Sequence, residues 1–220
     1  MRDVKWIKLG VTPYQEARDL QLKAREKVKQ GFADGILITL QHLPVYTVGS
    51  SGGFDNILIP MDQLKKKAEI YEVERGGNIT FHGPGQIVAY PIFNLEKWQK
   101  DVHLYVNMLE EVVIKLLSDY GIAAGRKQKY TGVWVGDEKI CALGVAIRHW
   151  ITWHGIAFNV NTDLNFFHLI NPCGITEFGV TSLEKLGIME DIQSVTNKMV
   201  EKFREVFDMD IEEMTLQDLK

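Results

Sequence analysis

The chain has 220 residues, of which 45% are hydrophobic and 25% charged, a composition typical of a globular domain rather than a disordered segment. Its 25 lysines and arginines face 29 aspartates and glutamates, so the net charge of −4 disfavours a general nucleic-acid binder. No apolar run approaches the roughly 20 residues of a membrane helix, and two cysteines are too few for a secreted disulfide scaffold. We therefore expect one cytoplasmic domain over residues 1–220, with reduced cysteines and neither a nucleic-acid nor a membrane partner.

The first half of the chain predicts a helix between two short strands, and a third strand after the second one. Apolar residues recur at helical spacing after Pro13, a residue type that suits the first helical position, and Gly31 is expected to end this helix. The string GSSGGFDN that follows cannot hold regular structure. Strands are expected at Trp6–Leu9, Gly35–Gln41 and Val45–Val48, and a loop at Gly49–Asn56.

The second half predicts two further long helices and a cluster of strands. Asp101 is a suitable N-cap for a helix that runs from about Val102 to Tyr120. The segment from Thr131 to Asn159 is rich in β-branched and aromatic residues, so we expect a hairpin and a third strand. Helices interleaved with adjacent strands favour an α+β fold, with a sheet backed by helices. A short helix with a Thr181–Glu184 capping box is expected to end at Gly187, and a last helix to begin at Ser194.

A glycine-rich segment, RGGNITFHGPGQ (Arg75–Gln86), is the first candidate for chemistry. Four glycines fall between Gly76 and Gly85, where 19 glycines in 220 residues predict about one. Glycines at this density let backbone amides approach a ligand closely, and Arg75 and His82 add a charge and a titratable ring. The same pattern is typical of a hairpin with tight turns, and it matches neither a Walker loop nor a dinucleotide fingerprint. On its residues alone the segment is either a binding loop or a plain hairpin.

The two cysteines and one lysine form the second candidate set. Cys173, in NPCG, is placed on a turn by its proline and glycine neighbours, which suits a nucleophile and a structural residue equally. Cys141, inside KICALGVAI, is expected to pack in the core. Lys139 begins the same strand, where a lysine is ordinarily a solvated edge residue. The functional interpretation is an ammonium against a thiol, whose usual pKa of about 8.5 falls beside a cation.

The strand segments around these residues raise a question about faces. His154, which opens HGIAFNV, is either a general base or a core histidine, and no histidine has ligand spacing with a cysteine, so no zinc or other metal is expected. In a regular strand Lys139 and Cys141 share one face, whereas Ala142 and Gly144 share the other. These small residues leave room for a closely packed helix or for a slender alkyl chain. Only a bulge near Gly144 would bring Lys139 to the same face as such a slot.

The ordered set RGGNITFHGPGQ, KICALGVAI, HGIAFNV, NPCGI and VTSL, from Arg75 to Leu183, closely resembles the octanoyltransferases of lipoate biosynthesis, the lipoyl(octanoyl) transferase family. Each motif alone is weak, but their order is specific. The resemblance implies the fold of biotin and lipoate protein ligase catalytic domains, a mixed sheet with helices on its outer side. It also implies octanoyl transfer from octanoyl-acyl carrier protein to a lysine of a lipoyl domain, through a cysteine thioester and without a cofactor. The implied acceptors are lipoyl domains of 2-oxoacid dehydrogenase subunits and the glycine cleavage H protein.

The same resemblance assigns roles to residues of this chain. Cys173 maps to the cysteine that carries the acyl thioester, and Lys139 to the lysine that lowers the pKa of that cysteine and handles protons. Cys141 stands where the family commonly has alanine, which would put a second thiol near the pocket. The implied substrate-binding residues are Arg75, Gly76, Gly77, Asn78, Ile79, Thr80, Phe81, His82, Ala142, Leu143, Gly144, Gly155, Ile156 and Ala157, with His154 as a further pocket candidate.

Two other functions compete with this one. An ATP-dependent lipoate or biotin ligase on the same fold uses a lysine like Lys139 but needs no cysteine nucleophile, so the Pro-Cys-Gly context argues against it. A non-catalytic acyl-binding module would never gain a covalent octanoyl group. The implied partners are acidic and this chain carries −4, so docking is expected to use a local basic patch. The candidates for that patch are Arg126, Lys127 and Lys129, or Arg148.

Overall fold

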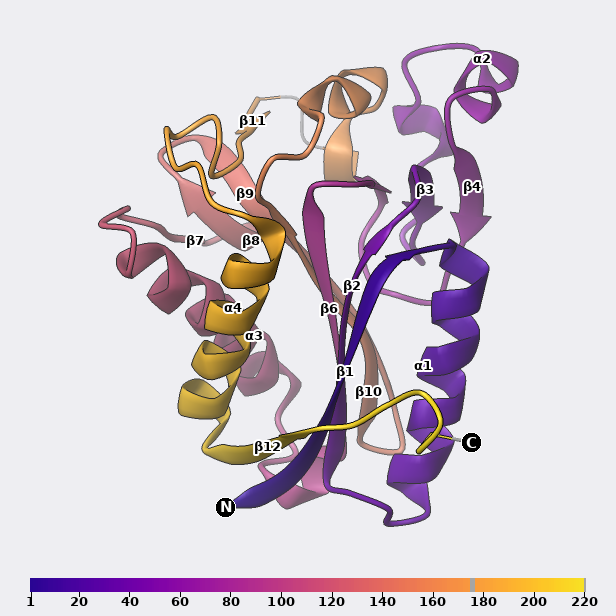
Figure 1. The fold of residues 1–220 in the computed structure, drawn as a ribbon. Helices are drawn as coiled ribbons and strands as arrows, with labels where there is room; N and C mark the ends of the chain where they lie inside the picture. The colour runs from indigo at the N-terminus through magenta and orange to yellow at the C-terminus, as the bar shows by residue number, and fades with distance from the viewer. Residues whose placement is uncertain (175–176, 220) are drawn as a thin grey trace.

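The computed structural model describes residues 1–174 and 177–219, without the side chain of Cys173. Its main feature is a mixed sheet with the strand order β12-β1-β2-β6-β10-β9-β8-β7, to which β11 adds beside β9 (Figure 1). β1 pairs in parallel with β2 and β12, and β11 in parallel with β9, whereas the other pairs are antiparallel. The strands are β1 (Arg2–Thr12), β2 (Gly35–His42), β6 (Gln86–Phe93), β7 (Gly125–Lys127), β8 (Tyr130–Val135), β9 (Glu138–Arg148), β10 (Ile151–Asn159), β11 (Gly179–Val180) and β12 (Met209–Glu213).

A second, three-stranded sheet with the order β4-β3-β5 stands beside the large one. The small sheet consists of β3 (Val45–Val48), β4 (Glu69–Glu72) and β5 (Ile79–His82).

None of the helices within the described ranges is long and apolar enough to cross a membrane. The helices are α1 (Tyr14–Lys29), α2 (Met61–Lys65), α3 (Val102–Ser118) and α4 (Ile192–Phe207), with the short 3-10 helices η1 (Phe54–Asn56), η2 (Leu95–Lys97), η3 (Leu164–Leu169) and η4 (Pro172–Gly174).

Alternating residues of the central strands supply two cores on the two faces of the large sheet. Leu37 and Ile87 pack with α3 and α4, whereas Ile36 and Val88 pack with α1. The predicted α+β fold with a mixed sheet backed by helices is confirmed. The helices lie on both faces of the sheet, because α1 covers the opposite face from α3 and α4 (Figure 1). Both faces of the central strands are therefore buried, as their nearly continuous apolar sequences require.

The helix caps confirm some boundaries and correct others. The Asp101 side chain accepts a hydrogen bond from the Leu104 N–H, so the predicted cap of α3 is confirmed. The prediction of a helix between Thr181 and Gly187 is wrong, because the segment is a turn. In this turn Ser182 Oγ accepts a hydrogen bond from Lys185 N. α4 begins earlier than predicted because Asp191, not Ser194, is its cap. The loop predicted at 49–56 holds the short helix η1 at its end.

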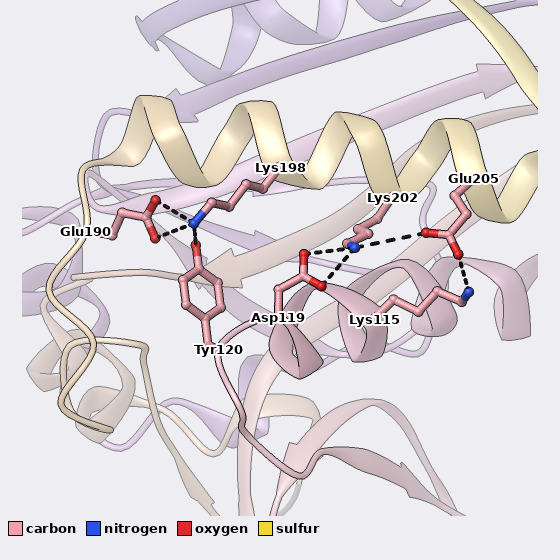
Figure 2. A network of polar contacts seen from close by, with 7 residues as sticks. All are labelled: Lys115, Asp119, Tyr120, Glu190, Lys198, Lys202 and Glu205. Carbon is pink, nitrogen blue, oxygen red and sulfur yellow. Dashed lines mark hydrogen bonds and ion pairs between the residues drawn. The ribbon is translucent and has the colours of Figure 1, made fainter.

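A network of ion pairs fixes α3 and α4 to each other on the outer surface (Figure 2). Lys202 of α4 lies 2.8 Å from Asp119, just past the end of α3, and 4.0 Å from Glu205. Glu205 in turn accepts from Lys115 of α3. Farther along α4, Lys198 lies 2.8 Å from Glu190 and 3.4 Å from the Tyr120 hydroxyl (Figure 2). Single exposed pairs contribute about 0–1 kcal/mol, so the buried faces of the two helices carry most of their attachment.

Candidate active site

The glycine-rich segment forms a loop followed by strand β5. Because side chains alternate along a strand, Thr80 and His82 face the large sheet, whereas Ile79 and Phe81 face the small core under η3. Asn78 turns away from the large sheet as well, since its Oδ1 accepts from Asn56 Nδ2 at 3.1 Å. Of the eight predicted residues from 75 to 82, Asn78, Ile79 and Phe81 therefore line neither of the two pockets described next and pack behind the loop.

Two adjoining pockets lie between this loop and strands β9 and β10, and they share Leu143 and Gly144 as a wall. The first, which we call the histidine pocket, holds about 30 Å³, about the volume that one water molecule occupies in the liquid. The second, the lysine pocket, holds about 290 Å³. The histidine pocket is lined by Tyr14, Thr47, Arg75, Thr80, His82, Val88, Tyr90, Ala142, Leu143, Gly144, His154, Gly155, Ile156 and Ala157, and the lysine pocket by Gly76, Gly77, Val106, Lys129, Tyr130, Thr131, Lys139, Leu143, Gly144 and Val145.

Arg75 lies against the wall that the two pockets share. Its guanidinium donates three hydrogen bonds to Thr47. Nε lies 3.2 Å and Nη2 2.8 Å from Thr47 Oγ1, and Nη2 also lies 2.6 Å from Thr47 O. Nη1 also donates to Gly76 O at 3.0 Å. A Cβ on Gly144 would lie 2.8 Å from Arg75 Cδ, closer than a methyl group can approach. Glycine at position 144 is thus required by the place of this buried arginine.

A β-bulge settles on which face Lys139 lies. β8 and β9 pair at Val133 and Cys141 and again at Trp134 and Lys139, so one step on β8 corresponds to two on β9. Because neighbouring residues of β8 face opposite ways, the extra residue, Ile140, puts Lys139 on the opposite face from Cys141. The bulge that the sequence argument required is therefore present, but it lies at residue 140 rather than near residue 144.

The ammonium of Lys139 is held at the edge of the lysine pocket. Its Nζ donates to Thr131 O at 3.0 Å and lies 4.8 Å from the ring centroid of Trp134, although the residue is only 8% exposed. Its stem passes close to Gly132, whose φ of 133° and missing side chain leave that space free. A cation over an aromatic face is attracted by the negative face of the ring. Lys139 thus presents a fixed, buried ammonium to the pocket.

The backbone of Cys173 lies in η4, which packs against β5 and η1; its side chain is outside the described part of the chain. Upstream, Asn171 N donates to Asn56 O at 2.7 Å, and Asn56 is the residue that bonds to Asn78 of the glycine-rich loop. Downstream, β11 pairs in parallel with Glu138 and Lys139. The segment that carries Cys173 is thus anchored at one end to the glycine-rich loop and at the other to the strand of Lys139.

Cys141 lies in the core, as its apolar strand predicts. The residue is fully buried in the core beneath α3 and α4, and it lines neither pocket. Burial raises the pKa of its thiol above the usual range, which keeps the group protonated and unreactive. The second thiol that the resemblance placed near the pocket therefore points away from it.

Two histidines of the histidine pocket are neutral, and hydrogen bonds hold the ring of His82. His82 Nε2 lies 3.2 Å from Thr47 Oγ1, and burial lowers the pKa of this ring well below its ordinary value, with further effects of His42 and Arg75. His154 has a left-handed backbone, with φ of 57°, and its backbone N–H donates to Gln21 Oε1 at 2.7 Å. Its ring Nε2 is buried without a hydrogen-bond partner among the described residues and lies 3.8 Å from Glu74 Oε2. Burial, with the nearby positive charge of Arg75, lowers the pKa of His154 to about 4.

This low pKa predicts a loss of stability in acid. In the unfolded chain His154 takes up a proton near its ordinary pKa of about 6.5, whereas in the folded chain it does so only near 4. The contribution of His154 to the unfolding free energy is therefore constant above about pH 6.5 and falls as the pH drops toward 4. We expect His154→Asn to remove about 2 kcal/mol of the loss of unfolding free energy between pH 7.5 and pH 5, measured by urea denaturation. Asparagine also tolerates the left-handed backbone.

His149→Asn is the matched control, because His149 has a φ of 53° but is exposed. An unchanged pH dependence in His154→Asn, or an equal change in His149→Asn, would remove burial of His154 as the cause.

The candidate basic patch is mostly neutralised. Arg126 is paired with Glu110 and Glu111, each at 2.9 Å, and Lys127 with Asp137 at 2.7 Å. These two residues therefore offer little charge to a partner, contrary to the expectation from sequence. Lys129 instead lines the lysine pocket, and Arg148 lies at the far end of β9 from Lys139.

Sequence reasoning missed several walls of the histidine pocket, which come from segments distant along the chain. Tyr14 opens α1, Thr47 lies on β3 opposite Thr80, and Tyr90 lies on β6, where its hydroxyl is 2.7 Å from His42 Nε2. No local pattern marks these residues. The nearest signal is the polar Thr47 within an otherwise apolar strand. Among the described residues, no cluster of histidine, cysteine and acidic side chains could hold a metal ion.

Comparison with known proteins places this geometry in a family. Residues 13–204 match the family described as "Lipoyl protein ligase A/B catalytic domain". The chain is 71% identical over 220 residues to an "Octanoyltransferase" of Thermoanaerobacter sp. (strain X514), covering 100% of this chain and 96% of the relative. It is 67% identical, with the same coverage, to one from Caldanaerobacter subterraneus subsp. tengcongensis. Among solved structures, a lipoate-protein ligase A bound with ATP superimposes with a TM-score of 0.79 at 19% identity, covering 99% of this chain and 92% of that one, a likeness of fold.

Proposed function

Because this chain belongs to the lipoyl protein ligase A/B catalytic-domain family, among its octanoyltransferases, we propose that it transfers octanoyl from an octanoyl-acyl carrier protein to a lysine of a lipoyl domain through a thioester on Cys173. The chain is an acyltransferase of lipoate biosynthesis. What we propose is the identity of its donor, its acceptor and its covalent intermediate. Its acceptors would be the lipoyl domains of 2-oxoacid dehydrogenase subunits and the glycine cleavage H protein. A cytoplasmic location and a single catalytic domain over residues 1–220 remain predictions.

The observation that carries the proposal is the pairing of β11 with the Lys139 end of β9. It returns the chain to the sheet beside Lys139 only six residues after Cys173. The other end of that segment is tied through Asn56 to the glycine-rich loop that lines both pockets. A nucleophile, a cation and a pocket for the acyl group are thus supported by three short segments that are bonded to one another.

The chemistry proceeds in two balanced steps. The thiolate of Cys173 attacks the thioester carbonyl of the donor, the bond to the phosphopantetheine sulfur breaks, and the ammonium of Lys139 gives that sulfur a proton. An amine of the acceptor lysine then attacks the enzyme thioester, Lys139 takes a proton from the attacking nitrogen, and Cys173 leaves as thiolate. Thioester exchange is nearly balanced and amide formation is downhill, so the reaction needs no ATP.

The Gly77 N–H is our proposed donor to the oxyanion that develops on the carbonyl. Gly76 N–H is occupied, since it donates to Val145 O at 2.9 Å. Gly77 lines the lysine pocket with a left-handed φ of 87°, and its N–H donates to no acceptor within residues 1–174 or 177–219. A preorganised backbone amide facing a developing negative charge stabilises the transition state.

The space of the two pockets bears on the acyl chain. Burying about seven methylene groups contributes about 5–6 kcal/mol before ordering costs. The lysine pocket, at about 290 Å³, offers room for the carbonyl end, whereas the histidine pocket has only about 30 Å³ of free space. We propose that the apolar end of the chain reaches past the shared wall at Gly144, which requires the Arg75 side chain to shift from its place over that glycine.

Gly144→Ala tests this use of the shared wall. The new methyl would lie 2.8 Å from Arg75 Cδ and 3.1 Å from Gly76 O, so we expect it to displace the loop and narrow the entrance. The expected result is a rise of about tenfold in KM for octanoyl donors, and a smaller effect for an acetyl donor that does not reach the wall, measured by steady-state transfer.

Gly125→Ala is the control, since a Cβ there meets open space. Equal losses for the octanoyl and acetyl donors in Gly144→Ala would show that the wall does not face the acyl chain.

The experiment that tests the proposed function compares two acyl sources. Octanoyl-acyl carrier protein and an unmodified lipoyl domain, mixed without ATP, should give the octanoylated domain by mass spectrometry. Octanoate with ATP should give none. Product only from octanoate and ATP would identify an ATP-dependent ligase, the alternative that the fold permits, and no product from either source would favour a non-catalytic acyl-binding module.

A further inference from the structure

A line of buried hydrogen bonds runs from strand β5 to the backbone of Lys139. His82 Nδ1 lies 2.8 Å from Gln86 Oε1, and Gln86 Nε2 donates to Asn159 Oδ1 at 2.9 Å. Asn159 Nδ2 donates to Thr181 O at 3.0 Å, and Thr181 N donates to Lys139 O at 3.0 Å. None of these five residues is more than 8% exposed. The line therefore connects the histidine pocket to Lys139 through the protein interior.

The direction of each bond follows from two backbone carbonyls. Thr181 O and Phe81 O can only accept, so Asn159 must present its amide nitrogen to the first and Gln86 to the second. Gln86 Oε1 is then left facing the ring of His82, which must carry its proton on Nδ1. Burial lowers the pKa of His82, so the ring stays neutral. His82 thus orients Gln86, which in turn orients Asn159.

Asn159 forms two hydrogen bonds with the segment that follows Cys173. Its side chain holds Thr181 O, and its backbone carbonyl accepts from Leu183 N at 3.1 Å. Thr181 is the residue whose N–H extends the ladder of β11 to Lys139 O. Asn159 therefore fixes where the chain from Cys173 rejoins the sheet, although it lines neither pocket.

We propose that Asn159 is a positioning residue for acyl transfer, whose side-chain amide, oriented by Gln86 and His82, holds the Cys173 segment at its distance from Lys139. The proposal rests on the proposed function, because it assigns Asn159 a role through the thiol and the ammonium of that mechanism. Loss of the amide lets the segment shift from β9, so the ammonium stabilises the thiolate less. The shift is favourable because, without the amide, the buried Thr181 carbonyl has lost its hydrogen-bond donor. A buried acceptor without a partner lowers the stability of the folded state by about 1–3 kcal/mol.

The test measures the reactivity of Cys173 itself. The pH dependence of its alkylation by iodoacetamide, followed on the peptide that contains it by mass spectrometry, reports the thiolate fraction without any turnover. We expect Asn159→Leu to slow alkylation at pH 7 by about five- to tenfold, as the thiol pKa moves toward about 8.5. We also expect kcat for octanoyl transfer to fall by about tenfold with little change in KM. Gln86→Met, which leaves Asn159 in place but without its orienting partner, should shift both in the same direction by less.

Thr152→Val is the matched control on the same strand. Thr152 is fully buried, donates to Pro91 O and accepts from Phe93 N, but lies at the other end of β10. We expect it to lower the unfolding free energy as Asn159→Leu does and to leave the alkylation profile at its wild-type position. An equal shift in Thr152→Val would overturn the proposal, because it would show general loosening of the sheet.

Lys139→Met separates this inference from the proposed function. If Lys139→Met raises the pH of Cys173 alkylation and neither Asn159→Leu nor Gln86→Met does, the positioning role is wrong and the mechanism stands. If Lys139→Met leaves the profile unchanged, the mechanism itself is wrong. If Asn159→Leu does not fold, as judged by circular dichroism, Gln86→Met alone decides between these results.

Discussion

Cys173→Ser is expected to lower octanoyl transfer by on the order of a thousandfold or more, because a serine hydroxyl is not ionised at neutral pH and requires a general base. His82 is not placed to act as that base, because its Nε2 faces Thr47 and its Nδ1 faces Gln86. Steady-state transfer from octanoyl-acyl carrier protein to a lipoyl domain measures the loss. The variant should fold normally, since a backbone hydrogen bond from Gly174 N to Asn171 O, at 3.0 Å, holds this turn.

Cys141→Ala is the control for this prediction. Its thiol is buried in the core and points away from both pockets, so we expect a modest loss of stability and an unchanged transfer rate per folded molecule. Retained transfer by Cys173→Ser together with inactivity of Cys141→Ala would exchange the roles of the two cysteines.

Lys139→Met and Lys139→Arg are expected to fail at different steps. Methionine retains an apolar stem of similar length against Trp134 but has no charge, so both acylation of Cys173 and transfer to the amine should slow, with kcat about 10²- to 10⁴-fold lower. Arginine retains the charge but cannot give up a proton, since its pKa exceeds about 12. It should therefore support acylation and block the second step, so that the octanoyl-enzyme accumulates.

Single-turnover experiments with each half-reaction distinguish these outcomes. Rapid mixing of Lys139→Arg with octanoyl-acyl carrier protein should give the covalent adduct, and adding a lipoyl domain should discharge it far more slowly than in the wild type. If arginine slowed both half-reactions alike, Lys139 would act by shape or charge alone rather than by accepting a proton.

The local patterns of the sequence predicted the long elements well, because those patterns are set by neighbouring residues. The apolar stripe of α3 and the Asp101 cap both follow from spacing along one helix. The mixed sheet came from the family resemblance rather than from periodicity. The segment from Thr181 to Gly187 carried a capping signal and forms a turn, because two of its amides bond to the end of β10 and the residue after it: Leu183 N donates to Asn159 O and Glu184 N to Val160 O.

The details of the site depend on contacts between distant segments, which local patterns do not encode. One extra residue, Ile140, reverses the faces of β9, and it is visible only once β8 pairs with that strand. Likewise, the charge of Arg126 is neutralised by Glu110 of α3, a residue that its own segment does not reveal. Asn159 gave no local signal as a residue that holds Thr181 O, since the two meet only because β11 returns beside Lys139.

The central claim, that the sulfur of Cys173 carries the octanoyl group, is tested most directly by intact-mass spectrometry of the wild-type protein quenched soon after mixing with octanoyl-acyl carrier protein. We predict a gain of one octanoyl group that neutral hydroxylamine removes, that maps to the peptide containing Cys173, and that disappears when a lipoyl domain is added. Full transfer activity with no such adduct, or an adduct on Cys141 or Lys139 in its place, would contradict the account.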